Sequence, residues 1–342
     1  MSNPAADRCL VSVIVPVFQG EADLDECVQS ITVQTHADLD VILVDDGSTD
    51  ASPGICDGWA ARDPRIRVIH GENGGLSVAR NRGLDVMKGR FVTFIDADDV
   101  VAPNYVADLL EARGSARADL VLADLVPFRV PGMPPAFRGP SRARTFPAQD
   151  VLADIVRTGI GFASCGKLIA ADLFATLRFR PQSDFEDLEI LPRLFAEAST
   201  VTVSDAAQYG YRQHEGSLMD GHRRFLRPSL LHVLDSNIEF IRAGEPDELR
   251  RQELTVGFVM HGMRTLESGA RSGVARAPGY DTQYRRFIRT HLRTLLASAH
   301  VSLPYKVATL VSLVSPSLFL RAVRLASGVK ATVAPNLRRR PN

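Results

Sequence analysis

The sequence predicts an α/β fold in which a mostly parallel sheet is flanked by helices and followed by a helical C-terminal region. Three observations support this prediction. Over the first 126 residues, short runs rich in Val and Ile alternate with amphipathic stretches. Acidic residues directly follow two of these runs, at positions where the carboxyl ends of parallel strands would meet. From about residue 228 onward, apolar residues recur at helical spacing instead.

The predicted strands are short and rich in Val and Ile, as expected for strands that are covered on both faces. They are Val11–Pro16, Val41–Val44, Ile66–Ile69, Phe91–Ile95 and Leu120–Val126. The stretches between them are long enough to form helices. These are Glu21–Gln34, Ser52–Arg62, Leu76–Met87 and Asn104–Arg113. Alternation of this kind is typical of βαβ units, whose strands are parallel.

Residues 128–147 are rich in Pro, Gly and Arg, and we interpret this segment as a loop or linker. A second region follows, with a segment at Gly161–Phe174, a helix from about Asp184 to Ala198 and a short strand at Tyr209–Gln213. Four further helices are predicted from the spacing of apolar residues. They cover Leu230–Ile241, Asp247–Leu266, Tyr284–Ser298 and Tyr305–Ala326.

The composition is typical of a globular protein with a substantial core. The 342 residues are 45% hydrophobic and 23% charged, which excludes a disordered chain and a polytopic membrane protein. The four cysteines, Cys9, Cys27, Cys56 and Cys165, show no paired spacing, which argues against a zinc knuckle and a disulfide framework. Reduced thiols favour a cytoplasmic location. The longest charge-free run near the C-terminus, residues 307–320, is too short to span a bilayer.

The net charge of zero hides a gradient along the chain. Residues 221–342 contain 20 basic and 8 acidic side chains, and the 11 charged residues after Asp281 are all basic. Two interpretations of the basic helices remain open. They either make peripheral contact with an anionic membrane or pack on the preceding region, with the terminal arginines in solvent. No nucleic-acid-binding module accompanies the charge, so we expect no nucleic acid partner.

An acidic string, Asp96-Ala97-Asp98-Asp99, follows the fourth predicted strand. Two carboxylates two residues apart at a strand end suit Mg²⁺ or Mn²⁺, which prefer oxygen ligands and leave positions for phosphate. The alternative is turn chemistry, with Asp99 as the N-terminal cap of the next helix. The string that starts at Asp45-Asp46-Gly47 follows the second strand in the same way. Its carboxylates could accept hydrogen bonds from a base or a ribose, or simply form a tight turn.

Glycines precede the helix Leu76–Met87, but they match no phosphate-binding motif, so we interpret them as a turn. Arg80 on this helix could pair with a diphosphate, or it could bridge two of the aspartates. Further along the chain, Ser183 and Glu186 match the S-x-x-E capping box, which gives Glu186 a structural role. Asp187 has no such role and is a candidate for catalysis, or for ordinary favourable charge in a first helical turn.

Taken in order, these strings closely resemble the family 2 glycosyltransferases, which are inverting enzymes of the Rossmann-like GT-A fold that use nucleotide sugars. The matching segments are 13–18 (VIVPVF), 44–50 (VDDGSTD), 73–81 (NGGLSVARN), 94–99 (FIDADD), 166–168 (GKL), 185–187 (FED), 211–212 (YR) and 216–217 (GS). The resemblance covers roughly residues 10–220. Gln19 stands where Asn is usual, and Cys165-Gly166-Lys167 stands where Trp-Asn-Lys is common.

The resemblance implies a catalytic domain at residues 1–220, with a donor half at about 1–127 and an acceptor half at about 148–220, before a basic helical region at 221–342. It also implies roles for individual residues. Those expected at the donor nucleotide are Pro16, Val17, Asp45, Asp46, Arg80 and Asp96. Asp98 is expected to ligate the metal, and His214 to close over the metal or the diphosphate. Asp187 is expected to be the general base.

The implied reaction is inverting transfer of a sugar from a nucleoside-diphosphate sugar, foremost a UDP-sugar, to a hydroxyl of a saccharide or lipid-linked acceptor. The resemblance further implies Mn²⁺ or Mg²⁺ as cofactor and a role in cell-envelope or exopolysaccharide synthesis. Two alternatives stay open on sequence alone. One is a non-catalytic nucleotide-sugar-binding or assembly protein with the same fold, and the other is a nucleotidyltransferase on a related sheet.

Overall fold

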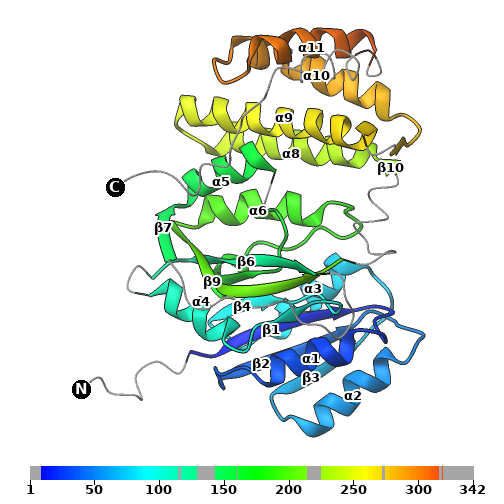
Figure 1. Cartoon of the computed structure of the whole chain (residues 1–342), viewed down its shortest axis with the longest axis vertical. Coiled ribbons are helices and arrows are strands. Elements are labelled where there is room, and N and C mark those ends of the chain that lie inside the picture. Colours follow the sequence, from blue (N-terminus) through cyan, green and yellow to red (C-terminus); the bar gives the residue numbers. More distant parts are fainter. Residues whose placement is uncertain are drawn as a thin grey trace. The chain divides into compact units, whose positions relative to one another are not determined.

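The computed structural model of the chain describes residues 9–114, 117–128, 143–159, 161–213, 225–271, 274–315 and 318. The chain forms two compact units (Figure 1). The first consists of Met1–Val151 and Ala163–His214, and the second of Leu152–Phe162 and Glu215–Asn342.

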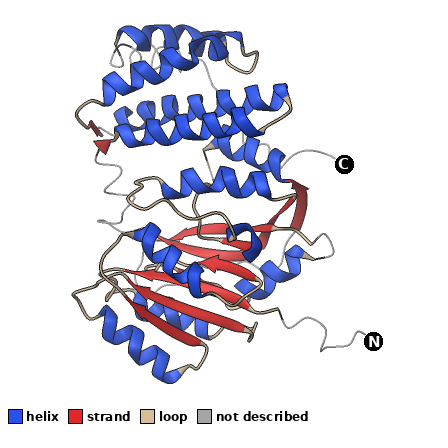
Figure 2. Cartoon of the chain, turned by 180° about the vertical axis from the view of Figure 1, so that it is seen from behind, coloured by secondary structure: helices blue, strands red, loops and turns tan. Residues whose placement is uncertain are grey.

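The first unit is built on a sheet of nine strands, counted over the described residues (Figure 2). The strands are β1 (Val11–Val17), β2 (Leu39–Asp45), β3 (Ile66–His70), β4 (Phe91–Phe94), β5 (Val100–Val101), β6 (Leu120–Phe128), β7 (Ala143–Pro147), β8 (Lys167–Ala170) and β9 (Thr200–Arg212). Their order in the sheet is β3-β2-β1-β4-β8-β6-β9-β5, and β7 pairs with β9.

Strands β3, β2, β1 and β4 are parallel neighbours, so their carboxyl ends lie at one edge of the sheet. Val17 at the end of β1 lies opposite Asp45 at the end of β2, and Ile14 of β1 lies opposite Phe94 at the end of β4. The α/β class with a sheet flanked by helices is therefore confirmed. Beyond β4 the sheet is mixed, because β8 runs antiparallel to both β4 and β6.

Seven helices lie between these strands in the described part of the chain, and one of them, the helix at 148–158, belongs to the second unit from Leu152 onward. They are α1 (Leu24–Thr32), α2 (Ser52–Arg62), α3 (Leu76–Val86), α4 (Tyr105–Arg113), α5 (Ala148–Thr158), the 3₁₀ helix η1 (Ala171–Phe174) and α6 (Glu186–Glu197). The five predicted N-terminal strands and the four helices between them are confirmed to within a few residues. The apolar pattern succeeds here because every residue of β1 and β2 is buried.

Part of the predicted linker at 128–147 is wrong. Residues 143–147 form the strand β7, which pairs antiparallel with β9. Four of its five residues are exposed, so the strand lacks the apolar run that marks a buried strand. Residues 129–142 of this segment lie outside the described part. Strand β9 is also longer than the predicted Tyr209–Gln213, since it begins at Thr200.

The second unit contains α8 (Pro228–Gly244), α9 (Glu248–Arg271), α10 (Tyr280–Ala297) and α11 (Leu303–Val314), with the short strands β10 (Phe225–Leu226) and β11 (Ala275–Arg276). All four predicted helices are present, although most of 315–326 lies outside the described residues. Their core is formed by residues such as Leu234, Phe258 and Phe287, which are fully buried. No helix among the described residues is long and apolar enough to cross a membrane.

Candidate active site

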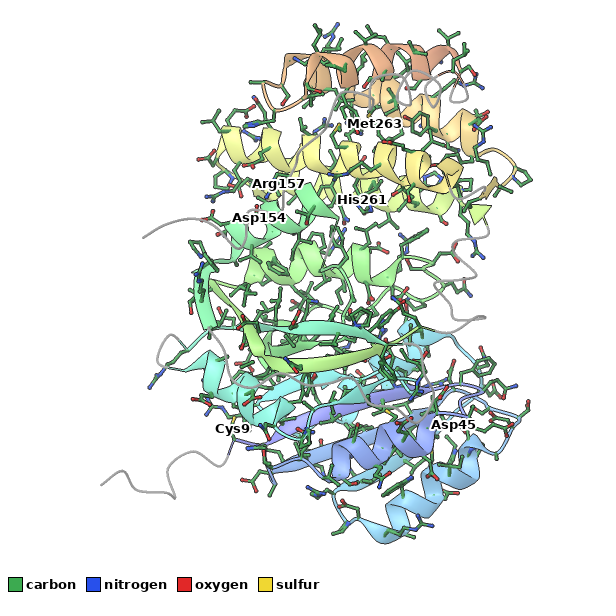
Figure 3. The ribbon with its side chains drawn as sticks, viewed as in Figure 1. Cys9, Asp45, Asp154, Arg157, His261 and Met263 are labelled. Carbon is green, nitrogen blue, oxygen red and sulfur yellow. The ribbon has the colours of Figure 1, made fainter. Side chains whose placement is uncertain are left out.

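Asp45 and Asp46 follow one another at the carboxyl end of β2, and Asp45 is labelled in Figure 3. One oxygen of Asp45 accepts a hydrogen bond from the Ser48 backbone at 2.9 Å, and the other is 2.9 Å from His70 Nδ1. Burial opposes ionisation of Asp45, but the hydrogen bonds from His70 and Ser48 outweigh it and lower its pKa. Asp45 is thus an ionised carboxylate whose two oxygens are both engaged.

Asp46 is also saturated with hydrogen bonds. Its Oδ1 accepts from the Gly74 backbone at 3.0 Å and from Arg82 at 2.8 Å, and its Oδ2 accepts from the Gly75 backbone at 2.7 Å. The carboxylate therefore fastens the turn before α3 to the end of β2. The backbone N–H groups of this turn already have a partner, which agrees with the turn predicted for these glycines.

The loop after β4 carries Asp96, Asp98 and Asp99 in different environments. Asp96 and Asp98 are half-buried, whereas Asp99 is buried. Asp99 accepts hydrogen bonds from the Tyr209 hydroxyl at 2.6 Å and from the Arg212 backbone at 2.7 Å. The sequence analysis offered Asp99 as the N-terminal cap of the next helix. The structure contradicts this alternative, because the residue before α4 is Asn104. Burial and the charges of Asp96 and Asp98 raise the pKa of Asp99 well above its ordinary value.

Arg80 on α3 joins this loop to the start of α6. Its side chain is 2% exposed, and its guanidinium donates to Asp96 at 3.2 Å, to Glu186 at 3.0 Å and to Asp187 at 2.9 Å. The bridging alternative for Arg80 is thus confirmed, with three carboxylates rather than two. Burial disfavours the charged guanidinium, but the three carboxylates outweigh it and raise the pKa of Arg80.

Asp187 lies in the first turn of α6 and is 26% exposed. Its Oδ1 accepts from Arg80 and from the Ser164 hydroxyl at 2.5 Å. Its Oδ2 has no hydrogen-bond partner among the described residues. The carboxylate is therefore held at one oxygen and open at the other, which is the arrangement that a proton acceptor requires.

The predicted capping box of Ser183 and Glu186 is wrong. The Ser183 hydroxyl donates to Glu189 and accepts from the Phe185 backbone, while Glu186 turns to Arg80. Glu186 pairs with Arg80 because a buried guanidinium without a carboxylate partner would cost more free energy than an uncapped helix start. Burial, together with the charge of Asp187, raises the pKa of Glu186 to about 7. Glu186 therefore belongs to the charged cluster, which its sequence pattern concealed.

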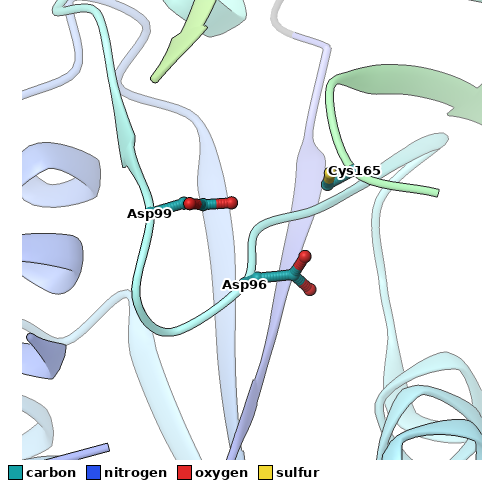
Figure 4. A group of neighbouring side chains, drawn as sticks. All are labelled: Asp96, Asp99 and Cys165. Carbon is teal, nitrogen blue, oxygen red and sulfur yellow. The ribbon is translucent and has the colours of Figure 1, made fainter. Parts of the chain in front are cut away.

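A divalent cation fits some of these residues and not others. Asp96, Asp99 and the thiol of Cys165 all lie within 4.8 Å of one another, with Cys165 reaching in from the segment before β8 (Figure 4). Both oxygens of Asp99 are engaged, and burial raises the pKa of the Cys165 thiol well above its ordinary value. A neutral thiol suits neither Mg²⁺ nor Mn²⁺. The half-buried Asp96 and Asp98 have the oxygen chemistry that these ions prefer.

The structure brings most of the predicted site residues to the same edge of the sheet. Pro16 and Val17 are buried at the end of β1, beside Asp45 and Asp46 of β2. His214 lies outside the described residues. The sequence analysis missed residues whose role depends on contacts distant in the chain. These are Ser164, Glu186, Tyr209 and Arg212.

Arg212 was noted only as part of a motif, yet it anchors the acidic loop. Its Nε donates to the Asp98 carbonyl at 2.6 Å, and its Nη2 donates to Glu26 on α1 at 2.5 Å. A long-range pairing of this kind leaves no local signal, because the partners are far apart in the sequence.

In open α/β sheets, ligands bind beyond the carboxyl ends of the parallel strands. The two acidic loops, the buried Arg80 and the open carboxylate of Asp187 all lie there. Residues 12–163 match the family model described as glycosyl transferase family 2. The chain is 33% identical over 221 residues to the glycosyltransferase GlyG of Streptococcus pneumoniae, which covers 61% of this chain and 73% of GlyG.

Solved structures show the same fold. TarS of S. aureus, residues 1–349 in complex with UDP-GlcNAc, superposes with a TM-score of 0.71 at 18% identity, covering 93% of this chain and 92% of that one. The mannosyltransferase PcManGT of Pyrobaculum calidifontis, in complex with GDP-Man and Mn²⁺, superposes with a TM-score of 0.56 at 15% identity. The superposition covers 95% of this chain and 89% of PcManGT. These findings define a transferase enzyme with the GT-A fold. The chain belongs to glycosyltransferase family 2, and the nucleotidyltransferase and non-catalytic alternatives are set aside.

Proposed function

We propose that the protein transfers a sugar, with inversion, from a UDP-sugar to a hydroxyl of a saccharide or lipid-linked acceptor, in cell-envelope or exopolysaccharide synthesis in the cytoplasm. One observation carries the proposal. Arg80 binds Asp96, on the loop at the donor edge of the sheet, and Asp187, the candidate base, through one guanidinium. The two groups that an inverting transfer needs, one near the diphosphate and one near the acceptor, are thereby held together.

Asp187 accepts the proton of the acceptor hydroxyl as that oxygen attacks the anomeric carbon. Its open Oδ2 receives the proton, while Arg80 and Ser164 hold Oδ1 and fix the orientation of the carboxylate. The sugar–phosphate bond breaks on the opposite face, and the nucleoside diphosphate leaves. No covalent enzyme intermediate is required, because a single displacement inverts the configuration.

Glu186 supports this role of Asp187. With a pKa of about 7, Glu186 is partly protonated at neutral pH, which limits the negative charge beside the base. Glu186 is thus a positioning residue in the proposal.

At the donor edge, Pro16, Val17, Asp45 and Asp46 form the wall of the nucleobase pocket. We assign the divalent cation, Mn²⁺ or Mg²⁺, to Asp98 with Asp96 beside it, since both are half-buried oxygen donors. When bound, such an ion supplies positive charge that stabilises the departing diphosphate. The complexes of TarS with UDP-GlcNAc and of PcManGT with GDP-Man and Mn²⁺ support a nucleotide-sugar donor and make UDP and GDP the first nucleotides to test.

The proposal is tested with the purified full chain and UDP-, GDP-, dTDP- and CDP-sugars, each with and without Mn²⁺. We expect one UDP-sugar to raise the melting temperature only with metal, and Asp98→Ala to abolish that shift. Asp187→Asn is expected to bind the donor and fail to turn it over. The matched control is Asp205→Asn, which changes an exposed carboxylate on β9. If no nucleotide sugar binds under any metal condition, the proposal is wrong.

A further inference from the structure

Helix α11 (Leu303–Val314) has its apolar and polar residues on unexpected faces. The face that packs into the second unit consists of small residues, Ala308, Thr309 and Ser312, which are at most 2% exposed. Their hydroxyls are satisfied within the helix, since Thr309 donates to the Tyr305 carbonyl at 2.7 Å and Ser312 donates to the Thr309 carbonyl at 2.7 Å. Thr309 also contacts Met263 of α9, which is labelled in Figure 3.

Four large apolar residues lie on the opposite face, whereas Tyr305, Val311 and Leu313 are half-buried. Leu303, Val307, Leu310 and Val314 are 73%, 52%, 46% and 72% exposed. Their spacing of four, three and four residues places them in one stripe along the helix, which we call the α11 stripe. A helix that packs on its own unit normally buries its largest apolar residues. The reversed arrangement marks the α11 stripe as an interaction surface.

Helices α10 and α11 carry only basic charges beyond Asp281, while Glu267 of the neighbouring helix α9 accepts a hydrogen bond from the Tyr305 hydroxyl of α11 at 3.4 Å. Every charged residue from 282 to 315 is basic. On the neighbouring helix α10, Arg286, Arg289 and Arg293 are exposed and recur at helical spacing. No ion pair or side-chain hydrogen bond engages these three arginines in the part of the chain that the structure describes. A row of exposed cations on a helix that packs against α11, together with the α11 stripe, is complementary to an anionic surface with an apolar layer beneath it.

We infer that the α11 stripe and the α10 arginines form a docking surface for an anionic lipid bilayer. Helix α11 has 12 residues, about 18 Å of helix, whereas the hydrocarbon core of a bilayer is about 30 Å thick. The helix therefore lies in the headgroup region with its four apolar residues inserted, rather than crossing it. A second copy of this chain is a poorer occupant, because a symmetric dimer through this face would bring like charges together.

Vesicle flotation of the full-length chain tests this inference. We expect the protein to bind phosphatidylcholine vesicles that contain phosphatidylglycerol and to bind pure phosphatidylcholine much more weakly. Val307→Ser with Leu310→Ser is expected to lower the affinity for the mixed vesicles by about tenfold or more at any salt concentration. The matched control is Leu249→Ser, because Leu249 on α9 is 79% exposed and lies outside the stripe.

The charge contribution is measured separately with Arg286→Gln and Arg289→Gln. Each change is expected to weaken binding about fivefold at low salt, with a smaller effect at high salt because screening shortens the reach of the charges. All of these positions are exposed, and circular dichroism and thermal unfolding verify that the variants fold.

Three results would overturn the inference. The first is no binding of the wild-type protein to anionic vesicles. The second is undiminished binding of the Val307→Ser, Leu310→Ser variant, which would assign lipid binding to another part of the chain. The third is a dimer in sedimentation without lipid that the same variant disperses, which would assign the stripe to a second copy. The assay contains neither donor nor acceptor, so its outcome is independent of the proposed function.

Discussion

Two groups of carboxylates at the same edge of the sheet differ in how their oxygens are used. At the end of β2, Asp45 and Asp46 have every oxygen engaged by a backbone N–H, a histidine or an arginine. Across the edge, Asp96 and Asp187 each give one oxygen to Arg80, and neither has a hydrogen bond to its other oxygen from a described residue. We conclude that the first group holds the chain in place and that the second group is available to a ligand.

The largest effect that tests this comparison is expected for Asp187→Asn. The amide cannot accept the acceptor proton, so kcat is expected to fall about 1,000-fold while the dissociation constant of the donor changes little. Steady-state kinetics and donor titration by calorimetry measure the two quantities. Asp205→Asn should leave both unchanged. A variant with more than a tenth of the wild-type kcat would show that another group is the base.

Arg80→Met is expected to cause the next largest effect, on stability. The change leaves three carboxylates facing one another without a cation, which should lower the free energy of unfolding by about 4 kcal/mol. Urea denaturation measures the loss. Arg82→Met is the matched comparison, because Arg82 pairs with Asp46 but is 30% exposed. Arg82→Met should lower the free energy of unfolding by only about 1 kcal/mol. Equal losses of stability in the two variants would contradict the central position of Arg80.

Glu186 predicts how stability depends on pH. Its pKa is raised from 4.5 to about 7 in the folded protein, so the folded state binds this proton more tightly than the unfolded state does. The stabilisation that Glu186 gives to the folded state is fully present below pH 4.5 and is lost as the pH rises through about 7. The loss of stability should amount to about 3 kcal/mol and be absent in Glu186→Gln. Glu197 is exposed at the other end of α6, so Glu197→Gln should leave the pH dependence of stability unchanged. An unaltered pH profile in Glu186→Gln would refute the prediction.

Asp46→Asn is expected to have the smallest effect. The amide nitrogen cannot accept hydrogen bonds from Gly74, Gly75 and Arg82 as the carboxylate does, so the free energy of unfolding should fall by about 1.5 kcal/mol. The loosened pocket wall should raise the KM for the donor several-fold and leave kcat nearly unchanged. Thermal unfolding and donor saturation curves measure the two effects. A collapse of kcat with unchanged KM would place Asp46 in the chemistry.

The sequence predicted the parallel half of the sheet well, because β1, β2 and β4 are fully buried and mostly apolar. It failed for β7, an exposed strand whose pairing with β9 has no local signal. The sequence of residues 152–162 also contains no pattern that assigns them to the second unit. That assignment depends on contacts such as the one between Arg264 and the Val156 carbonyl, more than 100 residues apart.

The candidate site shows the same division. The acidic strings were recognisable because they follow predicted strands. Their position at one edge of the sheet could be predicted because those strands are parallel. Glu186 was assigned to a capping box because Ser183 stands three residues before it. Its actual partner, Arg80, is 106 residues away in the sequence. Tyr209 and Arg212, which fix the loop after β4, were hidden for the same reason.

The most direct test of the comparison is to measure kcat of Asp187→Asn and Asp46→Asn side by side, at saturating donor and metal in one assay. If the Asp187 group is available for chemistry and the Asp46 group only holds the chain, kcat should be about 1,000-fold lower in Asp187→Asn than in Asp46→Asn. Equal losses of kcat in the two variants would contradict the account, because a saturated carboxylate and an open one would then contribute alike to the transfer step.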